Sequence, residues 1–166
     1  PGTALPCPMP GTTRLEAWTS GTPVGVSCLL GPMGAVSVAA VTQRFSTDPT
    51  TAYAGGELLE DASRRLRAER LAERALAGLL RREPAAASVG WVGVDMILGD
   101  RADGLGDRVL EVNPRVTTSF VGLSAAAPAS LVRAIVDVAA GISVERGRLP
   151  TRCRFSLTDD SSRHPP

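Results

Sequence analysis

The stretch GWVGVDMILGDRADGLGDRVLEVNPRVTTSFVG, residues 90–122, contains the pattern that decides the fold. Two apolar runs rich in valine and isoleucine, residues 89–98 and 108–112, flank a loop of glycine and aspartate. Such a pattern predicts two adjacent antiparallel strands joined by the loop 99–107. We expect the functional residues to lie on these two strands.

Polar side chains share one face of the predicted strand pair. Residues i and i+2 of a strand point to the same side, so Glu111 and Asn113 project together while Val112 points into the core. Pairing of the two strands brings Asp95 close to both. Three oxygen-bearing side chains, with no His or Cys among them, suit a hard cation such as Mg²⁺ or Mn²⁺.

The residues that follow the second strand extend this pattern. Pro114 ends the strand because it cannot donate to a ladder, and Arg115 comes next. A planar, permanently charged guanidinium beside a metal holds phosphate or carboxylate oxygens well. A purely structural interpretation also fits: Asp95 pairs with an arginine in a core strand, and Asn113-Pro114 only starts a turn.

The motif Glu111-Val112-Asn113-Pro114-Arg115, with Asp95 upstream, resembles the C-terminal catalytic core of the ATP-grasp superfamily. Its E-x-N-P-R form is similar to that of carbamoyl-phosphate synthetase and of many carboxylate-amine ligases. The longer run 109–119, with residues 93–95 before it, is most similar to the tyramine-glutamate ligase-like branch.

This resemblance implies a fold and a set of site residues. The fold would be α+β, an ATP-grasp C-terminal lobe with a mainly antiparallel sheet and helices packed on one side. Asp95, Glu111 and Asn113 would hold Mg²⁺ or Mn²⁺, and Glu111 and Asn113 would thereby bind ATP. Arg115 would be the catalytic residue that contacts phosphate or the acyl phosphate. Glu16 would line the adenine and ribose pocket, unless it is an exposed strand carboxylate.

The resemblance also implies a reaction. ATP converts a small carboxylate to an acyl phosphate, and an amine or a thiol then displaces phosphate. Family members hold the ATP phosphates partly with lysines of a preceding subdomain and a glycine-rich flap, but this sequence has no lysine. We therefore expect the chain alone to be an incomplete ligase that needs an N-terminal lobe in cis or in trans. The alternative is a non-catalytic nucleotide-binding or structural module derived from such an enzyme.

Composition narrows the function classes. The 166 residues, 43% of them hydrophobic, suffice for one domain. With 18 basic and 17 acidic residues, the charge gives no reason to expect nucleic acid as a partner. No apolar run is long enough to span a bilayer, so we expect no membrane partner. The only histidine, His164, lies in the tail, which excludes His-based zinc sites and Ser-His-Asp triads.

Cysteine usage and the chain ends complete the sequence-based expectations. Three widely separated cysteines indicate thiols in a reducing compartment, so we expect a cytoplasmic protein. The proline-rich residues 1–13 predict an irregular leader, residues 14–157 a partial ATP-grasp domain, and residues 158–166 a disordered tail.

The remaining elements follow from periodicity and turn signals. We expect a short strand at 14–19 with a turn at 21–23 after it, a hairpin of strands 24–30 and 35–43, a long connection over 44–58, helices at 61–83, 120–127 and 129–140, and an edge strand at 152–157. Gly55-Gly56 in the connection marks either a turn or a close approach of the backbone to a ligand. The core faces of the first and last helices are expected to consist of Leu66, Leu71, Ala75, Leu76, Leu79 and Leu80, and of Leu131, Val132, Ile135, Val136 and Val138. The hydroxyls of Thr117, Thr118 and Ser119 either contact phosphate or cap the next helix. Arg44 and Tyr53 receive no role.

Overall fold

A six-stranded antiparallel sheet forms the centre of the computed structural model, which describes residues 17–47, 52–83, 89–144 and 153–157. The predicted leader 1–13, the tail 158–166 and Glu16 lie outside the described residues. The strand order is β5-β4-β1-β2-β3-β6. The strands are β1 (Thr22–Gly31), β2 (Gly34–Phe45), β3 (Tyr53–Leu58), β4 (Gly90–Leu98), β5 (Arg108–Asn113) and β6 (Arg154–Ser156).

Most of the predicted strands are confirmed. The two runs around the loop 99–107 form β4 and β5, and the predicted hairpin forms β1 and β2. Two expectations were wrong. The turn at Gly55-Gly56 is part of β3, which pairs with both β2 and β6. Residues 17–19 of the strand expected at 14–19 are not in a strand, while residues 14–16 lie outside the described residues. The strand β1 begins at Thr22, within the turn expected at 21–23.

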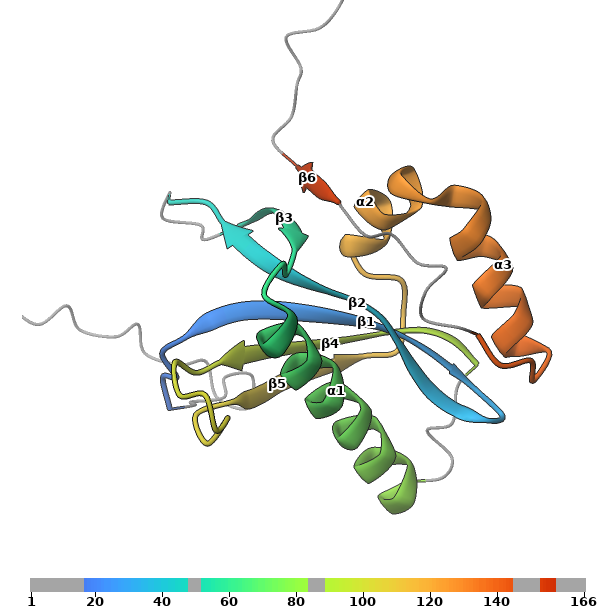
Figure 1. Cartoon of the computed structure of the whole chain (residues 1–166), viewed down its shortest axis with the longest axis horizontal. Coiled ribbons are helices and arrows are strands. Elements are labelled where there is room, and N and C mark those ends of the chain that lie inside the picture. The colour runs from blue at the N-terminus through green and yellow to red at the C-terminus, as the bar shows by residue number, and fades with distance from the viewer. Residues whose placement is uncertain (1–16, 48–51, 84–88, 145–152, 158–166) are drawn as a thin grey trace, which may run out of the picture.

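The long helix α1 (Ala62–Arg82) covers one face of the sheet, as Figure 1 shows. It begins after Asp61, whose carboxylate accepts hydrogen bonds from the backbone N–H groups of Ser63 and Arg64. The helix buries Ala68, Ala72 and Leu76 against the strands. These side chains share a hydrophobic cluster with the residues of β1 and β4 that face α1, namely Val24, Val26, Cys28, Leu30, Val92, Val94, Met96 and Leu98.

The other two helices, α2 (Ser119–Ala126) and α3 (Pro128–Ala139), lie together and apart from α1 (Figure 1). They bury Leu123 and Leu131 against Leu29 and Trp91 in a second hydrophobic cluster. Leu29 follows Cys28 in β1, and neighbouring residues of a strand point to opposite faces. The predicted α+β fold is therefore confirmed, with α1 as the helical layer on one side and α2 and α3 at one end of the other face.

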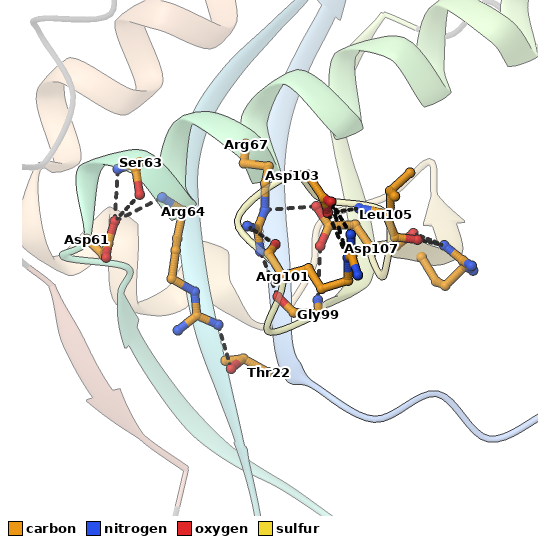
Figure 2. A network of polar contacts seen from close by, with 11 residues as sticks. Thr22, Asp61, Ser63, Arg64, Arg67, Gly99, Arg101, Asp103, Leu105 and Asp107 are labelled. Atoms are coloured by element: carbon orange, nitrogen blue, oxygen red, sulfur yellow. Dashed lines mark hydrogen bonds and ion pairs between the residues drawn. The ribbon is translucent and has the colours of Figure 1, made fainter.

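The loop between β4 and β5 is attached to α1 by a network of polar contacts (Figure 2). Arg67 of α1 pairs with Asp107, with 2.9 Å between Nε and Oδ2. Its two terminal nitrogens donate to the backbone carbonyls of Arg101 and Gly99, at 2.7 and 2.8 Å. The backbone N–H of Gly99 also donates to Asp107, at 2.9 Å. One arginine therefore fixes both ends of the loop.

Within the described residues, no single helix is long and apolar enough to cross a membrane. The segments Ser119–Ala126 and Ala129–Ala139 reach the length and apolar composition of a membrane span only when taken together, and the chain bends by 113° between them.

Candidate active site

The polar residues predicted on β4 and β5 do converge. Asp95 lies opposite Glu111 in the strand pair, and Gly93 lies opposite Asn113. The amide nitrogen of Asn113 donates to Oδ2 of Asp95 at 2.9 Å. Asn113 is buried, with 6% of its surface exposed, whereas Glu111 is exposed. The structure thus brings the three oxygen-bearing side chains to one face, as expected from the alternation of side chains.

A β-bulge in β5 determines the face of the sheet to which Glu111 points. Asp95 pairs with Glu111, but the next residue of β4, Met96, pairs with Val109, so Leu110 is an extra residue on β5. Val109 consequently packs against the hydrophobic cluster between α1 and the sheet, although it is only two residues from Glu111. In a regular strand these two residues would share a face. The bulge therefore turns Glu111 toward the site, a use of bulges that recurs next to active sites.

The Asp95 carboxylate is held from two sides. Gln43, at the end of β2, donates its amide Nε2 to Oδ1 at 2.8 Å, while Asn113 donates to Oδ2. Burial raises the pKa of Asp95 above its usual range, and the nearby Glu111 carboxylate adds to this. The hydrogen bond from Gln43, the Arg115 charge and the bond from Asn113 oppose the rise. Two neighbouring carboxylates, one of them partly buried, favour a positive charge between them.

These side chains line a cavity of about 310 Å³. Its walls come from β1, β2, β3, β4, β5 and the segment that leads into α2. The lining residues are Gly25, Val26, Val41, Gln43, Phe45, Tyr53, Gly93, Asp95, Leu110, Glu111, Asn113, Arg115, Thr117, Thr118 and Ser119. All site residues predicted from the described sequence therefore lie in one concave surface.

Tyr53 forms part of the aromatic wall of this cavity. Its ring meets Phe45 edge to face, with 5.8 Å between the ring centroids, and lies 6.4 Å from Phe155. Burial, followed by the negative charge of Asp95, raises the pKa of Tyr53 to about 12. The phenol therefore stays neutral at physiological pH and can both donate and accept a hydrogen bond.

Of the hydroxyl residues at 117–119, Thr117 and Ser119 take part in a chain of hydrogen bonds, and the N-cap Thr118 makes no side-chain cap hydrogen bond. Trp91 donates its indole N–H to Thr117 at 3.1 Å, and the Thr117 hydroxyl lies 3.0 Å from that of Ser119. The Ser119 hydroxyl in turn lies 3.1 Å from that of Ser27. Thr118 occupies the N-cap of α2 but makes no side-chain cap hydrogen bond. The capping alternative is therefore wrong for these hydroxyls.

Arg115 lines the cavity and is exposed to solvent. Its guanidinium makes a long hydrogen bond of 3.4 Å to the carbonyl of Val116, and its charge acts on Asp95. Glu16, the residue expected at the adenine pocket, lies outside the described residues. Gln43 was not among the predicted site residues, since it is the last residue of the predicted strand 35–43 and lies 52 residues from Asp95 in the sequence. Gln43 is two residues after Val41, so the two side chains share a face of the strand, and a polar residue on that face indicates a possible site residue.

The donor set fits a hard divalent cation. Asp95 and Glu111 offer carboxylate oxygens, and Asn113 uses its amide nitrogen for Asp95, which leaves its carbonyl oxygen for a ligand. Mg²⁺ and Mn²⁺ are bound in proteins by such oxygen ligands. In the described parts of the chain, no three or more His, Cys, Asp or Glu side chains are grouped so that they could hold a metal ion. The candidate set here instead combines two carboxylates with one amide oxygen.

Comparison with known proteins agrees with this geometry. The sequence model of a family described as ATP-grasp domain matches residues 10–119, which include Asp95, Glu111, Asn113 and Arg115. A search of curated proteins finds no match.

Solved structures show the same fold. An ATP-grasp superfamily protein from Archaeoglobus fulgidus is 25% identical, with a TM-score of 0.53 over 81% of this chain and 38% of that one. N5-carboxyaminoimidazole synthase from Aspergillus clavatus, in complex with ADP and 5-aminoimidazole ribonucleotide, is 18% identical, with a TM-score of 0.60 over 80% of this chain and 33% of that one. L-amino acid ligase from Bacillus licheniformis is 15% identical, with a TM-score of 0.53 over 73% and 30%. The chain therefore spans less than two fifths of the length of these proteins.

Proposed function

The chain belongs to the ATP-grasp family, and on that premise we propose that it is the nucleotide- and metal-binding lobe of an ATP-dependent carboxylate-amine or carboxylate-thiol ligase. One observation carries the proposal. Asp95, Glu111 and Asn113 meet on one face of two paired strands, and Arg115 lines the same cavity. The positions are those at which the E-x-N-P-R motif predicts metal and phosphate contacts.

Asp95, Glu111 and Asn113 would hold Mg²⁺ or Mn²⁺, which supplies positive charge beside the phosphate oxygens of ATP when it is bound. Arg115 would bind a phosphoryl or acyl-phosphate oxygen, and its exposed guanidinium is able to reach a ligand in the cavity. No side chain has to form a covalent bond to substrate in this scheme. Positioning and charge neutralisation carry phosphoryl transfer.

The substrates in this proposal are ATP, a small carboxylate and an amine or thiol. The similarity to tyramine-glutamate ligase-like proteins stays a prediction, as does a cytoplasmic location. Because the relatives are much longer, we propose that further lobes, in cis or in trans, supply the remaining ATP contacts. The alternative, a non-catalytic module that keeps the fold, differs in one respect: it need not retain a working metal site.

The test is calorimetric titration of Mg²⁺-ATP into the purified chain and into Glu111→Gln. Loss of one carboxylate ligand should weaken binding roughly tenfold or more, which corresponds to about 1.4 kcal/mol or more. Glu111 is exposed, so the circular dichroism spectrum and the melting curve should not change.

Glu60→Gln is the matched control, because Glu60 is also exposed but does not line the cavity. This variant should bind Mg²⁺-ATP like the wild type. Equal affinity of Glu111→Gln and the wild type would contradict the site assignment. A wild-type chain that binds no Mg²⁺-ATP would count against a nucleotide site in this lobe alone, either because the lobe needs the other lobes of a longer ligase or because it is a decayed relative.

A further inference from the structure

Gln43 lines the cavity and contacts a proposed metal ligand, but it has no part in the proposed function so far. It lies on β2, and its side chain reaches past β1 to Asp95 on β4, where Nε2 donates to Oδ1 at 2.8 Å. Asn113, on the opposite side, donates to the other carboxylate oxygen at 2.9 Å. Both oxygens of Asp95 are therefore fixed by amide donors from two different strands.

Gly25 provides the space for the contact between Gln43 and Asp95. It lies on β1 between the two strands, opposite Asp95 on one side and Val41 on the other. A Cβ atom at this position would lie 3.0 Å from Nε2 of Gln43 and 3.2 Å from Oδ1 of Asp95. Both distances are shorter than ordinary van der Waals contact, and the φ angle of Gly25 is not positive. The φ angle thus does not require glycine here, but a larger side chain would crowd both partners of the hydrogen bond.

We propose that Gln43 is a positioning residue, which holds the Asp95 carboxylate in the orientation needed to bind a divalent cation. This inference rests on the proposed function, because it assumes that Asp95 is a metal ligand. Repulsion between the Glu111 and Asp95 carboxylates disfavours rotamers that bring them together, and the hydrogen bond from Gln43 opposes this by holding Asp95 in place. Outer hydrogen bonds of this kind typically change metal affinity by about 10- to 100-fold.

A double-mutant cycle with Mn²⁺ tests the inference. Free Mn²⁺ is followed by its electron paramagnetic resonance signal while the ion is titrated into the wild type, Gln43→Leu, Asp95→Ala and the double variant. Gln43→Leu should weaken Mn²⁺ binding about tenfold, since leucine fills similar space without a donor. In the Asp95→Ala background the same change should have no further effect on the remaining affinity, because alanine has no oxygen for Gln43 to hold.

Two further variants separate positioning from a disturbance of the sheet. Gly25→Ala keeps Gln43 but crowds its contact with Asp95, so it should also weaken Mn²⁺ binding, and it serves if Gln43→Leu does not fold. Thr42→Val is the control, because the Thr42 hydroxyl donates to the carbonyl of Glu57 at 3.0 Å, on the side of β3. This variant should bind Mn²⁺ like the wild type.

The outcomes distinguish this inference from the proposed function. Mn²⁺ binding that is weakened by Glu111→Gln but not by Gln43→Leu would overturn the role of Gln43 and leave the metal site in place. An effect of Gln43→Leu that persists in the Asp95→Ala background would also overturn it, because Gln43 would then act without the side chain of residue 95. A wild-type chain that binds neither Mn²⁺ nor Mg²⁺-ATP would overturn both proposals.

Discussion

Tyr53 is the only tyrosine of the chain, so its phenol has a spectroscopic signal of its own. It lies in the cavity wall next to Phe45 and Phe155, and both its burial and the charge of Asp95 disfavour the phenolate. Ionisation of this one group therefore reports on the polarity of the candidate site.

We expect the absorbance of the folded chain near 295 nm to rise with a midpoint at about pH 12, compared with about 10 for an unperturbed tyrosine. Because the pKa is raised on folding, the stability linked to it is fully present below about pH 10 and is lost as the pH rises toward the folded value. Asp95→Asn should lower the midpoint, since it removes a negative charge. A wild-type midpoint near 10 would contradict the buried position of Tyr53.

At the scale of single residues, the sequence predicted the contacts that follow from the alternation of side chains along two neighbouring strands. Asp95, Glu111 and Asn113 could be placed together because their strands are neighbours in the chain as well as in the sheet. Gln43 could not be added, since its contact with Asp95 depends on the order of three strands, β2, β1 and β4. The role of Gly25 could not be predicted either, because only the strand order shows that this glycine leaves space for the hydrogen bond between Gln43 and Asp95.

Among the elements, the junction between α1 and the loop 99–107 depends most on one side chain. Arg67 binds a carboxylate and two backbone carbonyls, and the side chain of its partner Asp107 is only 5% exposed (Figure 2). Removal of one partner from a buried ion pair leaves an uncompensated charge. The loop in turn joins the two strands that carry the candidate site.

Arg67→Met should therefore destabilise the chain by about 3 kcal/mol, because methionine keeps the apolar stem but leaves Asp107 without its cation. Urea denaturation followed by circular dichroism measures the change. Arg101→Gln is the control, since Arg101 pairs with Asp103 at the surface and exposed pairs contribute little. A similar loss in both variants would show that the loop as a whole, and not the buried pair, matters.

The sequence predicted the presence of most elements, but it did not fix which face each helix buries. In α1 the buried residues are Ala68, Ala72 and Leu76, whereas the predicted core residues Leu66 and Leu79 are exposed. Two of the three buried residues are alanines, whose small side chains let the helix approach the sheet closely. The spacing of the leucines alone does not predict this face. In α3 the core residues are Leu131, Ala134 and Val138, and the expected Val132 and Val136 are exposed.

The strand β3 was missed because its glycines indicate a turn. Strands are depleted in glycine, so Gly55-Gly56 was interpreted as a break. In the structure, a Cβ at Gly55 would lie 2.3 Å from the carbonyl oxygen of Phe155, and one at Gly56 2.6 Å from that of Thr42. Glycine therefore allows close approach of neighbouring strands here, and close approach cannot be inferred from local sequence.

At the scale of the whole molecule, two hydrophobic clusters lie on opposite faces of the central strands. Leu76 of α1 belongs to one and Leu131 of α3 to the other, and both clusters include side chains of β1 and β4. Neither cluster is complete without these strands. We therefore expect the lobe to unfold as one cooperative unit.

Leu76→Ala and Leu131→Ala test this, and each should cost about 2–5 kcal/mol because both side chains are fully buried. Circular dichroism reports mainly on the long helix α1, whereas tryptophan fluorescence reports on Trp91 in the other cluster, since Trp18 is 93% exposed. Each variant should shift both signals to the same midpoint. Separate midpoints would mean that the two faces unfold independently.

The bulge at Leu110 has a consequence for how substitutions accumulate along β5. The strand is only six residues long, yet its first half supports the core through Val109 and its second half presents Glu111 to the cavity. The extra residue Leu110 lies between the core residue and the cavity residue, so a substitution that changes the side-chain volume at Val109 need not alter the direction in which Glu111 points. Loss of Leu110 alone would leave Val109 and Glu111 adjacent and therefore on opposite faces of a regular strand, so the bulge is the point at which β5 should tolerate a deletion without turning its core or cavity residues to the wrong face.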